Sequence, residues 1–232
     1  MPCTSLPRRL SVLVPALALL AGLMATEPAR AQAASSGSGF VPGTRTLYAL
    51  DLASVPVGEW PKGLKLLKGN VTVVEKDGEK MLRASDPAEM LVPLGEILPE
   101  DFTIEIDLVP KACCNPSDLA FEGTASSNRG PASMQVEWNP SHFMVVGGGE
   151  TAQSDMPEDL KAALPSMLTE VRASFDRGAF KLYTNGKKLV TLANRKFVHT
   201  RSLWVALGGQ DDDKYAVYVS RIRVATNSPK PQ

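Results

Sequence analysis

The sequence predicts an all-β domain, on three observations. Apolar and polar residues alternate over several short segments, which is the periodicity of half-buried strands. Gly, Pro, Asn and Asp separate these segments, and only one stretch has the pattern of a helix. Many short antiparallel strands joined by hairpins are typical of a sandwich or a barrel.

The strands follow one another along most of the chain. In residues 102–109, the side chains of Phe102, Ile104, Ile106 and Leu108 share one face, and polar side chains take the other. Residues 203–207 are apolar throughout, which indicates a buried strand that contains Trp204. The other segments with strand periodicity are 71–75, 79–84, 133–138, 168–175, 179–184, 187–192 and 215–224.

Two dipeptides predict tight hairpins. Asp77-Gly78 and Asn185-Gly186 each lie between alternating segments, and a type I′ turn needs two residues of positive φ, which these residue types tolerate. The one helix is expected over residues 157–164, with Asp155 as its cap and Pro157 at its first position.

Composition excludes several classes of protein. The 232 residues are 44% hydrophobic and 22% charged, with 25 Lys and Arg against 25 Asp and Glu. This is the profile of an ordinary globular protein, not of a disordered tail, a collagen or a strongly basic chain. Without the first 31 residues the balance is 22 basic to 24 acidic, so no nucleic-acid partner is expected.

The first 31 residues have the pattern of a signal peptide. Arg8 and Arg9 precede an apolar run at 10–24, and Ala-Arg-Ala follows at 29–31. The run is shorter than the roughly 20 residues that span a bilayer, although an uncleaved anchor remains the alternative. No second long apolar run follows, so we expect an exported, periplasmic or extracellular chain without a membrane span once processed.

The remaining segments divide by composition. Residues 32–39 are rich in Ser and Gly and are expected to be a flexible leader. Residues 227–232 are expected to be a disordered tail. The folded domain is therefore expected over residues 40–226, which is long enough for one good core.

The order of these pieces resembles a known superfamily. Asp51-Leu52, Val57-Gly58 and Pro61-Lys62-Gly63 are similar to the opening of secreted jelly rolls, and segments 69–75, 98–108, 172–186 and 219–225 follow in the same order. The chain resembles the laminin-G-like, concanavalin A-like lectin/glucanase superfamily over nearly all of residues 45–226. It is most similar to the domain that precedes peptidoglycan-binding domains in some bacterial outer-membrane porin A-type proteins. The resemblance implies a two-sheet antiparallel jelly-roll β-sandwich and a place in the bacterial envelope.

Glu105 and Asp107 are the weak catalytic candidates. Laminarinase-type hydrolases of this fold carry Glu-x-Asp-x-x-Glu on one strand, where period two brings the carboxylates to one face. Here Pro110 stands at the position of the last acid. We therefore expect solvent-facing acids on a strand, with catalysis as the alternative.

Cys113 and Cys114 are adjacent, and they are the cysteines left once Cys3 departs with the signal peptide. An oxidising compartment favours a disulfide between them. Neighbouring Cα atoms lie about 3.8 Å apart, below the usual disulfide range, so the bond would be strained. Free thiols and bonds to another chain are the alternatives.

No metal site is predicted with any strength. His142 and His199 have no ligand spacing with the cysteines. Asp211 and Asp213 are weak candidates for Ca²⁺, and the alternative is that they are solvated loop acids. No other cofactor is expected.

Carbohydrate binding needs an aromatic platform with nearby amide or carboxylate groups. Trp60 precedes Pro61 in a turn and is expected to be exposed. Trp138 is flanked by Glu137 and Asn139, although its alternation with Val136 favours the core. These four residues are the predicted ligand-binding set.

The sequence thus predicts an exported, non-catalytic binding module that recognises a glycan. A protein-interaction module of the envelope is the first alternative. A glycoside hydrolase whose acids come from elsewhere in the sheet is the second.

Overall fold

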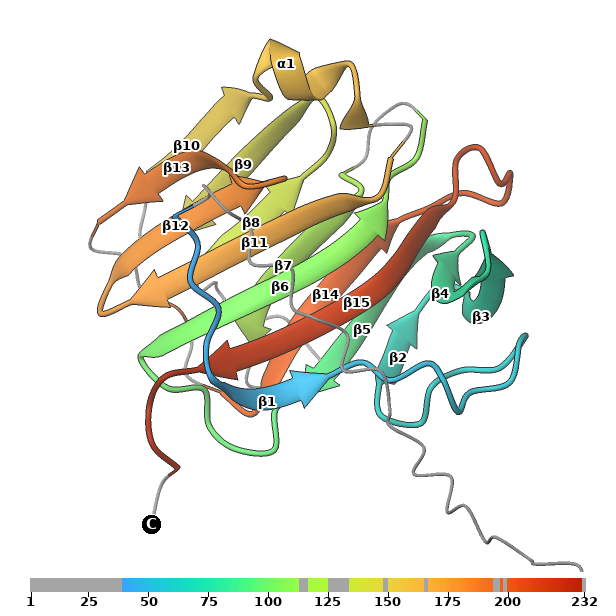
Figure 1. The fold of residues 1–232 in the computed structure, drawn as a ribbon, viewed down its shortest axis with the longest axis horizontal. Coiled ribbons are helices and arrows are strands. Elements are labelled where there is room, and N and C mark those ends of the chain that lie inside the picture. Colours follow the sequence, from blue (N-terminus) through green and yellow to red (C-terminus); the bar gives the residue numbers. More distant parts are fainter. Residues whose placement is uncertain are drawn as a thin grey trace, which may run out of the picture. The chain divides into compact units, whose positions relative to one another are not determined.

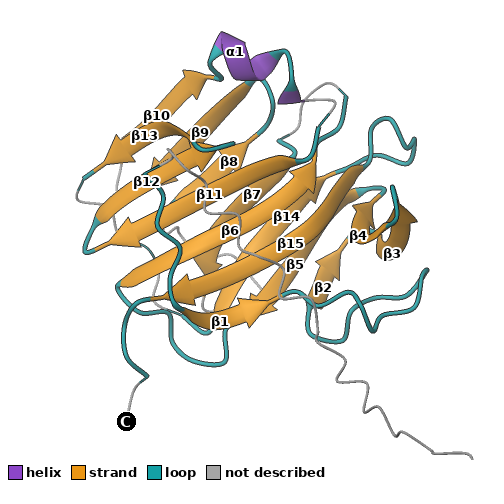
Figure 2. Cartoon of the chain, in the orientation of Figure 1, coloured by secondary structure: helices purple, strands orange, loops and turns teal. Residues whose placement is uncertain are grey.

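The computed structural model has two antiparallel β-sheets stacked face to face, so the predicted β-sandwich is confirmed (Figure 1). Strands dominate the described residues, and one short helix lies at one end (Figure 2). No helix within the described part of the chain is long and apolar enough to cross a membrane. The structure describes residues 39–112, 117–124, 134–147, 150–164, 167–193, 197 and 200–230.

The first sheet has eight strands in the order β13-β12-β11-β6-β15-β4-β3, with β1 paired to β15. Its strands are β1 (Arg45–Ala49), β3 (Val71–Lys76), β4 (Glu79–Ala84), β6 (Asp101–Val109), β11 (Thr169–Asp176), β12 (Ala179–Thr184), β13 (Lys187–Leu192) and β15 (Val217–Thr226).

The second sheet has seven strands in the order β10-β9-β8-β7-β14-β5-β2. Strands that are distant in sequence lie side by side, as β5, β14 and β7 do. Its strands are β2 (Lys65–Lys68), β5 (Pro87–Pro93), β7 (Leu119–Thr124), β8 (Gln135–Trp138), β9 (His142–Gly147), β10 (Glu150–Asp155) and β14 (Ser202–Gly208).

The core lies between the sheets and follows the predicted alternation. Ile104, Ile106 and Leu108 of β6 are at most 1% exposed and belong to the main apolar cluster. Trp138 of β8 is fully buried, and its indole Nε1 donates to Thr184 Oγ1 of β12 at 2.9 Å. This hydrogen bond connects the two sheets and satisfies a polar group that burial would otherwise leave unpaired.

Both predicted hairpin turns have the expected backbone. Asp77 and Gly78 have φ of 52° and 79°, and Asn185 and Gly186 have φ of 46° and 78°, as a type I′ turn requires. A third turn of this kind joins β11 to β12, where Arg177 has φ of 45°. The sequence pattern gave no signal for that turn, because Arg is not a residue that favours the left-handed region.

The helix is shorter than predicted. Helix α1 covers Glu158–Lys161, and its N-cap is Pro157, which makes no side-chain cap. The expected cap at Asp155 is wrong, because Asp155 is the last residue of β10 and pairs with His142 of β9. The ladder therefore extends up to the helix, and Leu164, which is fully buried, anchors the turn that follows it.

Residues 39–44 form a strap across the outer face of the eight-stranded sheet, running down the left side of the domain in Figure 1. The Phe40 ring meets the Tyr183 ring edge-on at 5.6 Å between centroids. Further along, the Gly43 amide donates to Thr103 Oγ1 at 3.0 Å, and Arg223 Nη2 donates to the Gly43 carbonyl at 2.8 Å. The strap is held from Gly39, the last residue of the expected leader, whose carbonyl accepts from the Tyr183 hydroxyl at 3.4 Å.

The start of the tail is also attached. The Thr44 amide donates to Asn227 Oδ1 at 3.1 Å, and Arg45 Nε donates to the Ser228 carbonyl at 3.0 Å. The expectation that the chain is disordered from residue 227 is therefore too broad for these first positions.

Candidate functional site

The described residues line three hollows. The hairpin pocket lies at the edge of the eight-stranded sheet, beside the β3–β4 turn. The loop pocket lies under the connection from β1 to β2. The sheet trough lies on the outer face of the seven-stranded sheet. Of the three, the sheet trough has all of its central side chains positioned by strands.

Four outward-facing residues form a row across the sheet trough. Glu89 of β5, Ala206 of β14, Ala120 of β7 and Glu137 of β8 are neighbours in register. Three strand spacings of about 4.8 Å place the Cα atoms of the two glutamates about 14 Å apart. The alanines between them form a low floor, so a hollow of about 220 Å³ lies there with a carboxylate at each end.

Hydrogen bonds fix both carboxylates. Ser117 Oγ donates to Glu137 Oε2 at 2.9 Å, and Gln135 Nε2 donates to Glu137 Oε1 at 2.9 Å. At the other end, the indole Nε1 of Trp204 donates to Glu89 Oε2 at 3.1 Å. Acceptors held in this way are preorganised for a ligand that brings hydroxyl donors.

Trp204 lies on the outer side of the sheet, not between the sheets. It is buried, as the sequence predicted, but it packs against Leu91 and Ala120 in a separate apolar cluster. Its register partners are Leu91 of β5 and Glu122 of β7. Trp204 therefore forms an apolar wall next to the row of Glu89 and Glu137.

The predicted ligand-binding residues separate in space. Glu137 lines the sheet trough, and Trp60 lines the loop pocket. Trp138 cannot serve as a platform, because it is fully buried between the sheets. Asn139 holds the β8–β9 turn instead, where its Oδ1 accepts from the amides of Ser141 and His142 at 2.8 and 2.9 Å. The alternation with Val136 was the correct signal for Trp138.

Glu105 and Asp107 lie on the opposite sheet from the trough and do not face solvent. Glu105 is 4% exposed, and its two carboxylate oxygens bind Arg221, at 2.6 Å, and Arg223. Asp107 binds Arg172 Nη1 at 2.5 Å. The expectation of solvent-facing acids is wrong, and the arginines leave neither acid placed for catalysis.

The calcium candidates face a cation of the protein itself. Arg83 Nε binds Asp213 Oδ1 at 3.0 Å, and Arg83 Nη2 lies 3.9 Å from Asp211 Oδ1. Tyr218 also donates to Asp213 Oδ1, at 3.1 Å. The described residues hold no cluster of three or more His, Cys, Asp or Glu side chains suited to a metal. Asp211 and Asp213 therefore interact with groups of the protein itself, and Ca²⁺ binding by these weak candidates stays an untested prediction.

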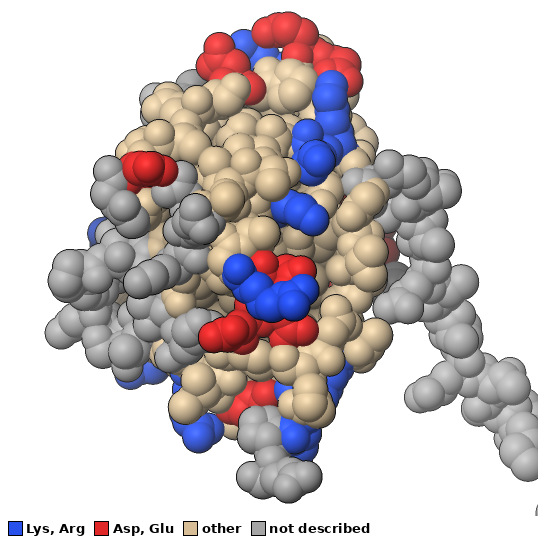
Figure 3. Space-filling view, turned by 90° about the vertical axis from the view of Figure 1, so that its left-hand side faces the viewer, with Lys and Arg blue, Asp and Glu red and all other residues tan. Residues whose placement is uncertain are grey.

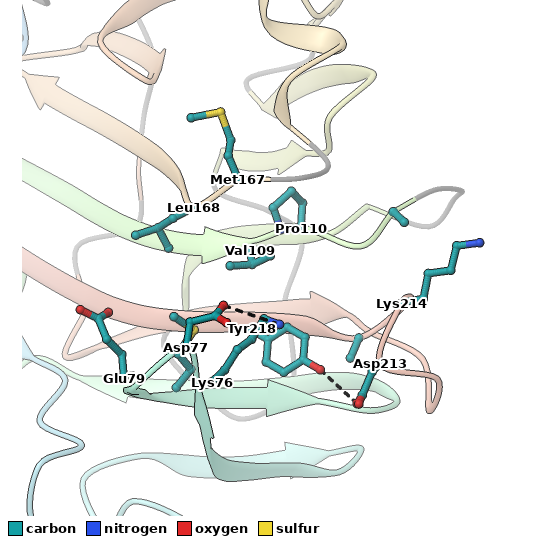
Figure 4. Close-up of a pocket in the computed structure, with 13 residues that line it drawn as sticks. Lys76, Asp77, Glu79, Val109, Pro110, Met167, Leu168, Asp213, Lys214 and Tyr218 are labelled. Carbon is teal, nitrogen blue, oxygen red and sulfur yellow. Dashed lines mark hydrogen bonds and ion pairs between the residues drawn. The ribbon is translucent and has the colours of Figure 1, made fainter.

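The hairpin pocket has a volume of about 510 Å³ and an apolar side (Figure 4). Met167, Leu168 and Pro110 face the charged β3–β4 turn across it. Its charges already interact with groups of the protein, because Lys76 Nζ lies 4.8 Å from the centre of the Tyr218 ring. We regard it as less suited to a polar ligand than the trough.

Lys111 and Asp118 form a buried ion pair behind the trough. Their side chains are each 1% exposed, with Nζ 3.3 Å from Oδ1. Lys111 Nζ also donates to the Gly208 carbonyl at 3.0 Å. Burial raises the pKa of Asp118 to about 6, against the opposing effect of the Lys111 ammonium. Cys113 and Cys114, between these two residues in sequence, lie outside the described residues, and their predicted disulfide stays a prediction.

The side of the domain in Figure 3 carries charges of both signs. Basic and acidic side chains lie next to each other there, and acidic ones gather at the end that holds α1, which includes Glu158 and Asp159. The described residues on this side form no extended patch of one sign.

The comparisons with known proteins show the fold. No family model matches the chain, and no curated protein matches its sequence. In structure it is similar to domain 4 of AbnA, a GH43 extracellular arabinanase from Geobacillus stearothermophilus, in complex with arabinotriose. The TM-score is 0.54, with 13% identity over 82% of this chain and 96% of that one.

Two further structures have the same fold. The catalytic domain of an endo-1,3-beta-glucanase (laminarinase) from Thermotoga petrophila RKU-1 has a TM-score of 0.52 and 14% identity, over 79% of this chain and 98% of that one. The ligand-binding domain of botulinum neurotoxin serotype D, in complex with N-acetylneuraminic acid, has a TM-score of 0.56 and 10% identity. That match covers 80% of this chain and about half of the toxin domain (48%). The likeness shows that the domain has the jelly-roll sandwich fold that the resemblance implied.

Proposed function

We propose that this protein is an exported, non-catalytic carbohydrate-binding module, and that a neutral glycan binds along the sheet trough. The observation that carries the proposal is the row from Glu89 to Glu137, with two fixed acceptors at the ends of an alanine floor. Sugar hydroxyls donate to such acceptors, while the low floor leaves room for a ring. The structural neighbours, which include a domain bound to arabinotriose, support a carbohydrate as the ligand class.

The charge of the trough favours neutral sugars. Glu89 and Glu137 place two carboxylates on this face, with Gln135 beside Glu137. A sugar acid would bring a like charge close to them, which disfavours binding. We therefore expect neutral oligosaccharides to bind more tightly than sialylated or uronic ones.

Calorimetric titration with both kinds of oligosaccharide tests the proposal. Replacing Ala206→Leu fills the floor without changing a charge, and Glu137→Gln removes one acceptor. Each is expected to weaken binding at least tenfold, whereas Glu100→Gln, an exposed acid that lines none of the three hollows, should have no effect. Unchanged affinity in a folded Ala206→Leu variant would refute the trough as the site.

Hydrolysis is the second candidate, because one pair of acids is suitably close. Glu122 lies opposite Gln135, two residues along β8 from Glu137, so the two glutamates are diagonal neighbours with Cα atoms about 7 Å apart. Paired carboxyl groups of glycosidases are about 5–9.5 Å apart, a separation that Cα atoms at this distance permit, although Glu122 is only 4% exposed. Turnover of labelled polysaccharides that disappears in Glu122→Gln would overturn the non-catalytic proposal.

A further inference from the structure

The connection from β1 to β2 is long for a compact domain. It covers residues 50–64 and contains no helix or strand. Connections longer than about 12–15 residues are uncommon and are usually functional or disordered. This one is held in place, because the Val73 amide donates to the Glu59 carbonyl at 2.9 Å and Lys80 Nζ donates to the carbonyls of Ala53 and Val55 at 2.9 and 2.7 Å. An ordered connection of this length therefore points to a function.

The held connection encloses the loop pocket, whose volume is about 480 Å³. This is within the range of about 300–1,000 Å³ typical of small-molecule sites. The rings of Tyr48 and Trp60 both line it and pack against the main core. Trp60 is fixed, because its indole Nε1 donates to the Leu64 carbonyl at 2.8 Å. Two positioned aromatic side chains thus form part of the wall.

Polar groups complete the wall. Asp51, Glu59 and Lys62 line the same hollow. Asp51 Oδ1 accepts from the Ala53 amide at 2.9 Å, which orients its carboxylate. Burial raises the pKa of Tyr48 to about 12. The pocket therefore offers two carboxylates, one ammonium and the hydroxyls of Tyr48 and Ser54 next to two aromatic rings.

We propose that the loop pocket is a second saccharide site, which binds a single neutral or amino-substituted pyranose ring. The C–H face of a sugar packs on an aromatic ring while its hydroxyl groups bind the surrounding polar atoms. An apolar ligand would leave Asp51, Glu59 and Lys62 without compensation for lost water. An anionic sugar would meet two carboxylates against one ammonium.

The second site rests on the proposed function in one respect, that the ligand is a carbohydrate. The two sites share no lining residue. In these proposals an extended sugar chain lies across the four strands of the sheet trough, whereas a single sugar ring binds in the loop pocket. Two sites on one domain would raise avidity for a polysaccharide that can engage both.

Each site has a blocking variant that keeps its polar groups. A Cβ added at Gly63 would lie 4.0 Å from the Tyr48 hydroxyl, which is ordinary contact, and Gly63 has no positive φ. The backbone at Gly63 therefore accepts a Cβ, and Gly63→Leu is expected to extend its side chain into the loop pocket. Ala206→Leu, which fills the trough, is the matched control.

The experiment is saturation-transfer NMR on the protein with N-acetylglucosamine, glucosamine and N-acetylneuraminic acid. We expect ring-proton signals for the first two sugars to fall at least fivefold in Gly63→Leu and to persist in Ala206→Leu. Asp51→Asn with Glu59→Gln should lower the glucosamine signal most. Thermal unfolding checks that each variant is folded.

Three results would overturn the second site: no signal in the unmodified protein, an equal signal in folded Gly63→Leu, or a stronger signal with N-acetylneuraminic acid. The proposed function fails separately, if oligosaccharide affinity does not change in Ala206→Leu. Either proposal can therefore be refuted without refuting the other.

Discussion

The buried pair of Lys111 and Asp118 predicts a pH dependence of stability. In the folded protein the pKa of Asp118 is raised to about 6 by burial, whereas an unfolded Asp has a pKa of about 3.9. The folded state therefore binds the proton more tightly, and this group stabilises the fold most below pH 4. The contribution is lost as pH rises through 6.

The magnitude follows from the shift. About two pKa units correspond to about 3 kcal/mol, at 1.36 kcal/mol per unit. Replacing both partners, Lys111→Met with Asp118→Asn, removes both charges and keeps an acceptor for the Lys111 amide, which donates to Asp118 Oδ2 at 2.9 Å. Removing one partner alone would leave an uncompensated buried charge.

Urea unfolding of both proteins between pH 4 and pH 7.5 measures the effect. The free energy of unfolding of the unmodified protein, minus that of the double variant, should fall by about 2.4 kcal/mol from pH 4 to pH 7.5, because an unfolded Asp is already about half ionised at pH 4. Asp86→Asn, which changes an exposed acid, should give a flat difference. A flat or rising difference for the double variant would refute the reasoning.

Four further outcomes are expected. Trp138→Phe should cost about 1–3 kcal/mol by leaving the buried Thr184 hydroxyl without its donor, yet should leave glycan affinity unchanged in titration. Glu105→Gln should lower the free energy of unfolding in urea by about 3 kcal/mol, because two arginines lose their charged partner. If the variant instead lost turnover and kept its stability, Glu105 would again be a candidate catalytic residue. Gly186→Ala, at φ 78°, should lower stability by about 1–2 kcal/mol through strain in the turn, whereas no change would argue against the type I′ geometry. Intact mass after alkylation without reductant should show Cys113 and Cys114 unmodified, and two added groups would exclude their disulfide.

The alternation of apolar and polar residues predicted the surroundings of the core-facing side chains of each strand better than those of the outward-facing side chains. In β6 the apolar face of Ile104 and Ile106 is in the core, as alternation requires. The same alternation placed Glu105 in solvent, but the arginines that cover it come from β15, more than 100 residues later. The alternation of residues shows which face of a strand is more polar, but it carries no information about which side chains from other strands pair with that face.

The residues of the sheet trough could be predicted from the sequence only in part, for the same reason. Glu137 was a predicted ligand residue, but Glu89 and Trp204 became its neighbours only through the order of β5, β14, β7 and β8. Trp204 lies in a run of five apolar residues, where period two gives no clue to its side. Glu89 is the one acid of β5, a strand that is otherwise apolar apart from its prolines, and this isolated acid was the signal that could have indicated it.

The two outer faces of the sandwich differ in what they leave available. Across the middle of the eight-stranded sheet, Glu105 and Asp107 are neutralised by arginines, and the strap at residues 39–44 lies over the same face. Across the seven-stranded sheet, hydrogen bonds from uncharged groups orient Glu89 and Glu137, and no ion pair to either is found among the described residues. Oriented acceptors beside an open floor can still bind a ligand, whereas acceptors already held by guanidinium groups contribute to stability. Of the two sheet faces, the outer face of the seven-stranded sheet is therefore the one on which an extended glycan is expected to bind.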